Sequence, residues 1–477
     1  MKVVEIAVVL AYCVFIVGIG FYFKNRASRT AGGYWSAETN IGIGVNAFAL
    51  LATVMSGGGM MGNIGLAAGL GIPFILSANL GAGAGLGVGS LLVAQPMRKA
   101  GAKTVAEFIK MRFPNRVISY LVPIIVAITY TIYLVAQMKA SGTVGQYLLG
   151  VSYNTGLIVT WIIFTFYVAI GGMLAVTWAD FIQGMLMMLV VVACSLAALF
   201  HFGGFEATMA TAVGYFPDIG TISMPVSAYA AFFLLWVCVG LCSPHILMRV
   251  STTKNPFGAR VSMNGGMFLI TIFSILTSIV LGAATRATIG SAQVPNPDAA
   301  FLMLLDIIFN PFWKGLAAAG IFAAIMSTAA GLLLAAAAAI ANDIIVNLHQ
   351  TGMSPEKQAN LGRIMVFSVS LIVLLLSFNP PKYLTLLYSA AMGFLVSGLM
   401  VPLLAGLWWK GTTEIGALVS IVAGASTYAV CFFAFQMPKF TEIFVAIPVG
   451  VVCIVVFSLA SKAPSPETLQ QVEAWHA

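Results

Sequence analysis

The sequence predicts an all-α polytopic membrane protein with about thirteen transmembrane helices. Of its 477 residues, 60% are hydrophobic and only 8% are charged, whereas soluble domains contain about 25% charged residues. The mean hydropathy is +1.02. Apolar stretches of about 20 residues, the length that a helix needs to cross a bilayer, recur at 4–23, 42–69, 73–96, 118–148, 155–173, 177–201, 227–249, 265–286, 313–347, 362–379, 385–409, 415–436 and 441–461.

The distribution of lysine and arginine predicts how the chain crosses the membrane. If the N-terminus lies outside, 16 of the 22 lysines and arginines fall on the inner side and 5 on the outer side. Cytoplasmic loops are enriched in these residues, so we expect the C-terminus in the cytoplasm and a plasma membrane, of the bacterial inner-membrane type. Basic loops also explain the net charge of +8 without a nucleic-acid partner. The first stretch, 4–23, has no small-residue cleavage pattern after it, which predicts a retained helix.

The sequence gives no sign of a metal centre or an enzyme active site. The six cysteines all fall in apolar stretches without a CxxC motif, which favours packing over metal binding. Only four histidines occur, and no acid–base constellation lies inside the predicted spans.

The second apolar stretch contains a run of glycines, LATVMSGGGMMGNIG at 51–65. Each glycine costs a helix interior about 1 kcal/mol relative to alanine. Freed backbone groups survive in a bilayer only against protein or a polar cavity. One interpretation is a broken transmembrane helix whose loose backbone lines a solute or ion site. The other is a close helix–helix contact that the glycines permit.

A second interrupted stretch occupies the corresponding place in the other half of the chain. We take residues 42–201 and 227–409 as two groups of five spans each. Because five is an odd number of membrane crossings, the second group has the opposite orientation in the membrane to the first. Its first stretch reads FLLWVCVGLCSPHILMR at 233–249, interrupted by Gly240 and Pro244. Interrupted segments at matching places indicate a transporter site. One transporter domain is therefore predicted, with a leading helix at 4–23, trailing helices within 415–461 and a polar tail at 462–477.

Five motifs in combination resemble the sodium:solute symporter family over about residues 4–459. They are ATVMSGGGMMG at 52–62, AIGGMLAVTWADFIQG at 169–184, SPHILMR at 243–249, GIFAAIMSTAAGLLLAAAAAIANDI at 320–344 and PLLAGLWWKGTTEIGALVSIVAG at 402–424. Within the family the chain looks closest to pantothenate and monocarboxylate carriers. The resemblance implies a five-plus-five inverted repeat with one leading and two trailing helices.

A sodium site is predicted where the ninth span meets the first broken helix. Ala324, Ser327 and Thr328 share one helix face because they lie at positions i, i+3 and i+4, and hard cations prefer oxygen ligands. The resemblance implies that Na⁺ is held by the hydroxyls of Ser327 and Thr328 and by the carbonyls of Ala52, Met55 and Ala324. The alternative is a packing face of small residues.

Some family members carry a second sodium site, which uses the acidic residue of the WxD motif and two further hydroxyls. Asp180 matches the acid, but the hydroxyl positions are Ala330 and Gly331 in this chain. This departure predicts one sodium ion per substrate. Asp180 then either attracts sodium on its way out to the cytoplasm or anchors the neighbouring loop.

Lys139 is the basic residue that lies deepest in a predicted span, where an ammonium costs at least about 2.5–3.5 kcal/mol. One interpretation is that Lys139 and the amides of Gly57, Gly58 and Gly59 hold a substrate carboxylate, since a helix N-terminus favours an anion. The other is that Lys139 snorkels to the outer interface. Ser56, Gln137, Phe233, Trp236 and Tyr388 complete the predicted substrate site.

For His245, beside Pro244, a structural role in bonding broken backbone is favoured over proton relay.

The sequence therefore predicts a sodium-coupled symporter that imports a small organic solute by alternating access, and not an enzyme. The main expectation is a carboxylate such as pantothenate or a monocarboxylate. The alternative is a neutral solute, either a sugar or an amino acid. A channel or receptor on the same scaffold is less favoured, because no filter-like carbonyl ring is evident. The expected partners are the solute, Na⁺ and the lipid bilayer, and no oligomer is required.

Overall fold

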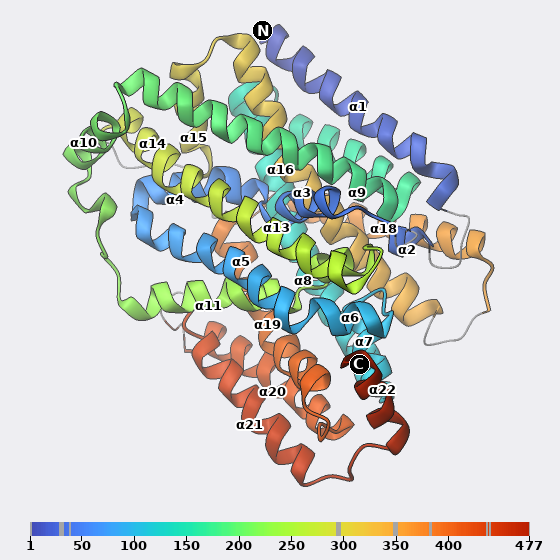
Figure 1. Ribbon diagram of the computed structural model, residues 1–477. Helices are drawn as coiled ribbons and strands as arrows, with labels where there is room; N and C mark the ends of the chain where they lie inside the picture. Colours follow the sequence, from blue (N-terminus) through green and yellow to red (C-terminus); the bar gives the residue numbers. More distant parts are fainter. Residues whose placement is uncertain are drawn as a thin grey trace.

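The computed structural model confirms the predicted all-α class (Figure 1). It describes residues 2–27, 33–37, 40–291, 297–346, 352–380, 384–435, 437 and 440–476. These residues form helices and no strand, apart from one isolated bridge between Ile41 and Thr253. Three residues counted in the charge asymmetry, Arg29, Lys382 and Lys439, lie outside the described residues.

The helices follow one another with short connections. In the first half they are α1 (Val3–Ala27), α2 (Gly33–Ser36), α3 (Ile43–Val54), η2 (Gly58–Gly62), α4 (Asn63–Leu70), α5 (Ile72–Leu92), α6 (Ala94–Ala100), α7 (Val105–Arg112), α8 (Arg116–Val144), η3 (Gly145–Leu149), α9 (Tyr153–Phe202), α10 (Phe205–Tyr215) and η4 (Pro217–Gly220). In the second half they are α11 (Val226–Cys242), α12 (Pro244–Ser251), α13 (Pro256–Ile275), η5 (Leu276–Leu281), α14 (Gly282–Ile289), α15 (Pro297–Ile308), α16 (Pro311–Ala338), η6 (Ala339–Val346), α18 (Pro355–Ser377), α19 (Leu384–Trp408), α20 (Glu414–Phe433), α21 (Ile443–Leu459) and α22 (Pro466–His476).

The predicted number of thirteen spans is not confirmed. Within the described residues, ten helices are long and apolar enough to cross a membrane, or eleven if the bent pair α3 and η2–α4 counts as one span. The spans predicted at 155–173 and 177–201 are both part of α9, in which Gly172 departs from helical geometry (φ 55°, ψ −154°). The last predicted span corresponds to α21, whose 17 residues are fewer than the roughly 20 of a typical span.

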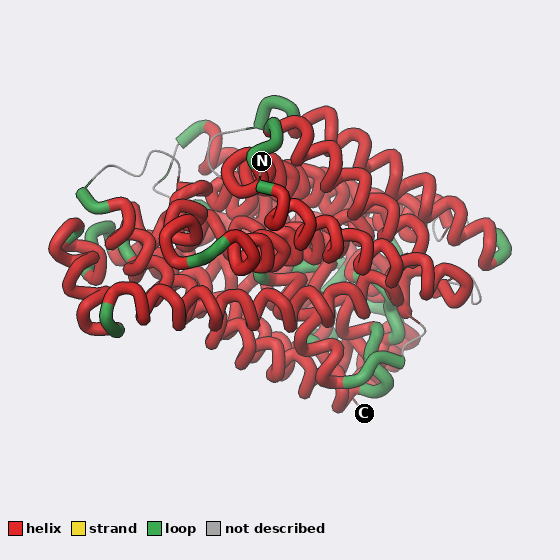
Figure 2. The backbone as a smooth tube through the Cα atoms, turned by 90° about the horizontal axis from the view of Figure 1, so that it is seen from above, coloured by secondary structure: helices red, strands yellow, loops and turns green. Residues whose placement is uncertain are grey.

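Helix α16 occupies the centre of the bundle, where it contacts α1, α3, α8, α9 and α18. From Gly315 onward nearly all of its residues are buried. Its alanine-rich sequence allows neighbouring helices to approach closely, which is how helices associate in membranes. Viewed from above, most of the connecting loops lie at the periphery of this helical bundle (Figure 2).

Both predicted interruptions are present. The axes of α3 and the following helical segment differ by 68°. Helix α11 ends at Cys242, Ser243 is extended (φ −70°, ψ 123°), and Pro244 begins α12. Gly240 does not interrupt the helix, contrary to the prediction. A Cβ there would come within 2.5 Å of the Gly85 carbonyl carbon, so this glycine lets α11 pack closely against α5.

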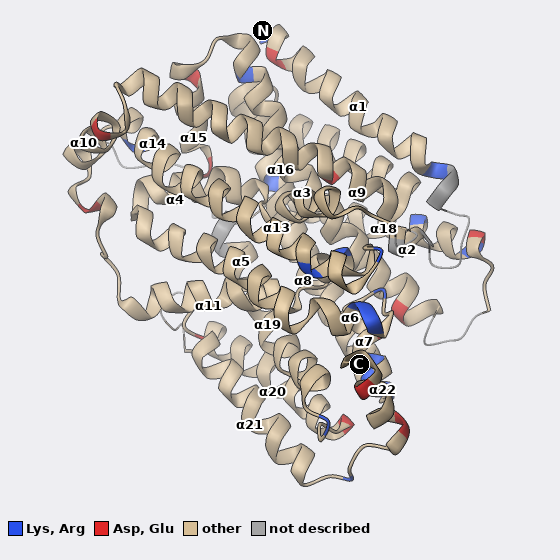
Figure 3. Ribbon diagram, in the orientation of Figure 1, with Lys and Arg blue, Asp and Glu red and all other residues tan. Residues whose placement is uncertain are grey.

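Lysine and arginine gather toward the end of the bundle that carries α6, α7 and the C-terminus (Figure 3). This asymmetry agrees with the basic inner face that the sequence predicts. The orientation itself, with the N-terminus outside, stays a prediction.

Candidate functional site

The first helix break lies slightly earlier than the glycine run. Helix α3 ends at Val54, and Met55 has non-helical geometry (φ −84°, ψ 91°). Gly57 is helical again (φ −55°, ψ −38°), and the next residues form the π-helical turn η2. The expected opening across Ser56–Gly59 is therefore corrected to Met55 and Ser56. Ser56 stabilises the new turn, since its Oγ accepts a hydrogen bond from the Gly59 amide at 3.1 Å.

The glycines also serve the close packing that was the alternative interpretation. A Cβ on Gly57 would come within 2.4 Å of Ile325 Cγ1, and one on Gly58 within 2.3 Å of Tyr388 Cε1. A Cβ on Gly59 would meet its nearest heavy atom only at 3.8 Å. The structure thus confirms a helix break beside the glycine run and close packing at Gly57 and Gly58. That the break lines a solute or ion site stays a prediction.

Gly57→Ala is expected to destabilise the protein by about 1–3 kcal/mol, the usual cost of overpacking, and to impair transport. The physical reason is that α16 must move away from the break to accommodate the added methyl group. Gly59→Ala is the matched control for stability and should leave the thermal denaturation midpoint close to that of wild type, because an added Cβ has space there. Thermal denaturation compares the two variants, and uptake by Gly57→Ala is measured against wild type. An equal loss of stability in the two variants would contradict the prediction.

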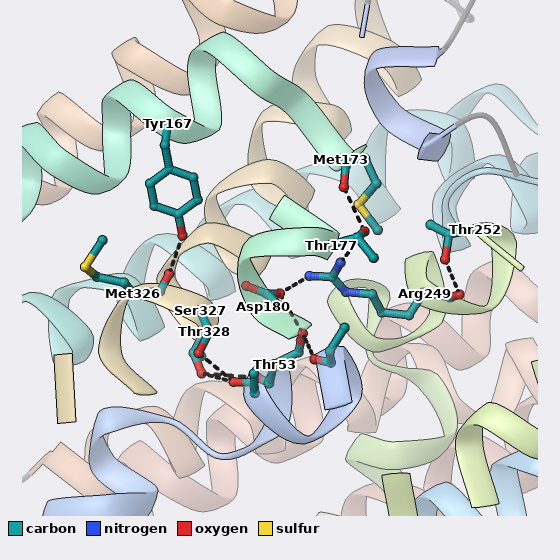
Figure 4. A network of polar contacts seen from close by, with 12 residues as sticks. Thr53, Tyr167, Met173, Thr177, Asp180, Arg249, Thr252, Met326, Ser327 and Thr328 are labelled. Atoms are coloured by element: carbon teal, nitrogen blue, oxygen red, sulfur yellow. Dashed lines mark hydrogen bonds and ion pairs between the residues drawn. The ribbon is translucent and has the colours of Figure 1, made fainter. Parts of the chain in front are cut away.

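The predicted hydroxyl pair faces the end of α3. Ser327 Oγ donates to the Ala52 carbonyl at 2.8 Å, with the Ala324 carbonyl at 3.2 Å. Thr328 Oγ1 lies 3.3 Å from the Ala52 carbonyl and 3.2 Å from the Thr53 carbonyl (Figure 4). Both side chains are fully buried. The structure thus brings Ser327, Thr328, Ala324 and Ala52 together, and it adds the Thr53 carbonyl, which the sequence did not suggest.

This cluster offers uncharged oxygens from two helices at one buried point. Such a donor set suits a monovalent hard cation, which needs oxygen ligands but no formal charge beside it. Among the described residues no group of three or more histidine, cysteine, aspartate or glutamate side chains could hold a metal ion. Met55 lies at the end of α3, and its role as a sodium ligand stays a prediction.

A small cavity lies at the break. Its described lining residues are Val54, Met55, Ser56, Gly59, Asn63, Ala78, Asn79, Ala82, Phe232, Trp236 and Tyr388. Four predicted substrate residues, Ser56, Gly59, Trp236 and Tyr388, are therefore at the cavity. Phe233 is not, because its side chain is 39% exposed and the preceding residue, Phe232, faces inward instead.

The cavity also contains two asparagines that the sequence interpretation missed. Asn63 Nδ2 donates to Asn79 Oδ1 at 2.9 Å, and Asn79 Nδ2 donates to Ser278 Oγ at 2.9 Å. Tyr388 donates to Asn63 Oδ1 at 3.3 Å. Amide side chains within apolar spans were the signal that would have found them, because polar groups are expensive in hydrocarbon.

Gln137 lies beside the break and caps it. Its Oε1 accepts a hydrogen bond from the Gly57 amide at 3.1 Å. Two of the three glycine amides assigned to a substrate carboxylate therefore already have partners within the chain, Gly57 with Gln137 and Gly59 with Ser56.

A family model described as the sodium:solute symporter family matches residues 34–424. The matched region contains both helix breaks and the hydroxyl pair of α16. This chain belongs to the sodium:solute symporter family. The family assignment made from the sequence motifs is confirmed.

Relatives of this symporter are similar along almost the whole chain. The "High-affinity proline transporter PutP" of Bacillus subtilis is 27% identical over 466 residues, covering 95% of this chain and 97% of the relative. The "Osmoregulated proline transporter OpuE" of the same species is 27% identical over 477 residues, covering 97% and 96%. These relatives do not support the resemblance to pantothenate and monocarboxylate carriers.

Solved structures show the same fold. A Na⁺-coupled sialic acid symporter, in a substrate-bound outward-open state, superposes with a TM-score of 0.82 at 18% identity and covers 97% of this chain and 99% of its own. The nucleobase-cation symporter MHP1 gives a TM-score of 0.57 at 14% identity, covering 92% and 97%.

In this symporter, Asp180 lies deep inside the protein rather than at a loop. It is fully buried on α9 and forms an ion pair with Arg249 of α12. Arg249 also donates to Thr177 Oγ1 at 2.7 Å, and Thr53 Oγ1 lies 3.2 Å from Asp180 Oδ2 (Figure 4). The idea that Asp180 anchors a neighbouring loop is therefore wrong. A role in sodium exit stays a prediction, and Asp180 Oδ1, which has no hydrogen-bond partner among the described residues, is the oxygen available for it.

Lys139 has an acidic partner of the chain's own. Its ammonium lies 3.0 Å from Asp298 Oδ2, and the two side chains are 12% and 3% exposed. Asp298 lies 159 residues away in sequence, at the beginning of α15. This ion pair supplies the compensation for which the sequence interpretation invoked a substrate carboxylate. Direct contact between Lys139 and a substrate stays a prediction.

His245 lies at the second break, where its ring contacts the side chain of Tyr130 rather than freed backbone. The predicted role in bonding broken backbone stays a prediction. Tyr130 Oη accepts a hydrogen bond from the His245 amide at 3.2 Å and lies 2.7 Å from His245 Nδ1. Whether the hydroxyl or the ring nitrogen donates in this second contact depends on the tautomer of the ring. His245 thus fastens the start of α12 to α8.

Proposed function

We propose that this symporter carries a small zwitterionic amino acid inward together with one sodium ion, and that proline is the first candidate. The observation that carries this proposal is the chemistry of the cavity at the helix break. Of the described residues that line it, none is charged. A solute without net charge suits such a cavity, because an unpaired ion would lose its hydration without compensation.

The cavity offers separate surfaces for the two parts of an amino acid. Trp236 Nε1 lines the cavity, and Gln137 Nε2 lies beside the break without lining the cavity. Both are buried donors without a hydrogen-bond partner among the described residues. A buried unsatisfied donor costs about 1–3 kcal/mol, so a carboxylate that accepts from them would gain that energy. The ring of proline would pack against Phe232 and Trp236, and carbonyls at the break would accept from the amino group.

The proline transporters among the relatives support the amino-acid alternative over pantothenate or a monocarboxylate. Lys139 supports the amino-acid alternative as well. Its ammonium is paired with Asp298, so the buried charge does not require an anionic substrate to compensate it.

Sodium and substrate are coupled because both bind at one break. Sodium would join the end of α3 to α16, and the substrate would contact the residues just beyond, at Ser56 and Gly59. Each ligand then favours the conformation that the other needs, and this differential affinity is the coupling. Asp180 would lie on the route by which sodium leaves toward the cytoplasm.

Uptake by proteoliposomes tests the proposal. With an inward sodium gradient we expect accumulation of labelled proline above its external concentration, and no accumulation when potassium replaces sodium. Unlabelled amino acids should compete, whereas pantothenate, monocarboxylates and sugars should not. Sodium-driven accumulation of a monocarboxylate but not of proline would contradict the substrate assignment. Solute equilibration without accumulation would indicate a channel.

A further inference from the structure

Thr53 contacts the sodium cluster with its backbone and the Asp180–Arg249 pair with its side chain. Its carbonyl oxygen lies 3.2 Å from Thr328 Oγ1. Its hydroxyl lies 3.2 Å from Asp180 Oδ2 and 2.7 Å from the Ala49 carbonyl (Figure 4). The residue is fully buried. One residue at the end of α3 therefore joins two polar sites that lie on different helices.

The Thr53 hydroxyl has a single hydrogen and two acceptors. A threonine in a helix can satisfy its hydroxyl with the carbonyl one turn earlier, which here belongs to Ala49. The bond to Asp180 is thus an additional interaction that can form or break while α3 remains helical. Its strength depends on the distance between α3 and α9.

Asp180 in turn holds α12, the second half of the other broken helix. Arg249 of α12 forms the ion pair with Asp180. The Arg249 carbonyl also accepts a hydrogen bond from Asn46 of α3 at 3.1 Å. These contacts tie α3 of the first broken helix, α12 of the second and α9 together.

A glycine of α16 lies beside Thr53, so α16 provides no side chain at this position that could connect the sodium cluster to Asp180. At Gly331, where the family resemblance led us to look for a hydroxyl, an added Cβ would lie 3.4 Å from Thr53 Cγ2 and 4.0 Å from Arg249 Nη2. Gly331 has no side chain that could reach Asp180. In this chain the polar connection from the sodium cluster to Asp180 runs through Thr53.

We propose that Thr53 is a positioning residue that couples sodium binding to the Asp180–Arg249 pair. Sodium bound between α3 and α16 fixes the end of α3, and the Thr53 hydroxyl then holds the Asp180 carboxylate in the position that pairs with Arg249. Closure of α12 against α3 and α9 thereby follows sodium occupancy. The inference rests on the proposed sodium coupling at this site.

The test compares Thr53→Val, which removes the hydroxyl at nearly constant volume, with Thr53→Ser, which retains it. Thr160→Val is the matched control, because among the described residues that buried hydroxyl donates only to the Gly156 carbonyl one turn earlier. A hydrogen bond to a charged group that forms in one state only is expected to change an affinity about tenfold or more. Thr53→Val should therefore raise the sodium concentration for half-maximal proline uptake about tenfold. Thr53→Ser and Thr160→Val should stay within about twofold of wild type, the ordinary scatter for neutral substitutions.

Repeating Thr53→Val in an Asp180→Asn variant distinguishes the loss of the Thr53–Asp180 interaction from a change in the geometry of α3. There Thr53→Val should have little further effect, because the charged partner is gone. If Asp180→Asn abolishes uptake, hydrogen exchange of residues 244–251 in nanodiscs replaces the transport assay. Sodium should slow this exchange in wild type and Thr53→Ser but not in Thr53→Val. A thermal shift at high sodium should still detect sodium binding by Thr53→Val.

Two outcomes would overturn the role of Thr53. One is a Thr53→Val protein with wild-type sodium dependence and a wild-type sodium response in exchange. The other is a Thr53→Val effect that is equally large in the Asp180→Asn background, which would assign it to the Ala49 bond. Absence of sodium-dependent uptake in the wild-type protein would instead refute the proposed function.

Discussion

Thr328→Ala should raise the sodium concentration needed for half-maximal uptake by roughly ten- to a hundredfold, the value of one bond to a charged group. Thr328 Oγ1 lies within 3.3 Å of the Ala52 carbonyl, so we expect this hydroxyl and that carbonyl to share the cation. Under saturating sodium, the substrate concentration for half-maximal uptake should change little. The measurement is initial uptake in proteoliposomes over a matrix of sodium and substrate concentrations.

Two controls accompany this prediction. Thr328→Ser retains the hydroxyl and should remain close to wild type. Ser370→Ala removes a buried hydroxyl of α18 that donates to the Phe367 carbonyl, and it should leave sodium dependence unchanged. Equal changes in the sodium and substrate requirements of Thr328→Ala would remove Thr328 from the ion site.

Arg249→Met should destabilise the protein by about 3–5 kcal/mol, because it leaves the carboxylate of Asp180 buried without its counter-ion. Both side chains are at most 1% exposed, so water cannot replace the lost partner. Asp180→Asn should lower the stability by a similar amount, because it leaves the guanidinium of Arg249 buried without its counter-ion. Thermal denaturation of the purified protein in detergent measures both effects.

The double substitution Asp180→Asn with Arg249→Met is the decisive comparison. Replacing both members of a buried pair by neutral groups removes the uncompensated charge, so the double variant should be more stable than either single variant. Additive losses in the double variant would show that the two side chains do not act as a pair.

The sequence was sufficient for features that depend on local pattern. Membrane-spanning length, the interruption before Pro244 and the shared face of Ser327 and Thr328 follow from composition and helical spacing. The break near Ser56 was found as well, but its boundaries were not. Glycine propensity is a weak indicator: Gly57 and Gly58 are helical and lie in close contact with Ile325 and Tyr388.

Features that depend on pairing between distant segments could not be predicted from one sequence. Asp180 and Arg249 are 69 residues apart, and Lys139 and Asp298 are 159 residues apart. Phe233 was assigned to the cavity in place of Phe232 because one residue turns a helix by about 100°, and the sequence of α11 is apolar on all sides. Asn63 and Asn79 are recognisable in the sequence as amides within apolar spans, but their hydrogen bond to each other follows only from the packing of α4 on α5.

Equilibrium binding of radioactive sodium to the purified protein tests the central claim most directly, because it requires neither a known substrate nor transport. The wild-type protein should bind one sodium ion saturably per chain. The double variant Ser327→Ala with Thr328→Ala should show no saturable binding although circular dichroism shows it to be folded. Sodium binding by that folded double variant with wild-type affinity would show that the ion is not held between α3 and α16.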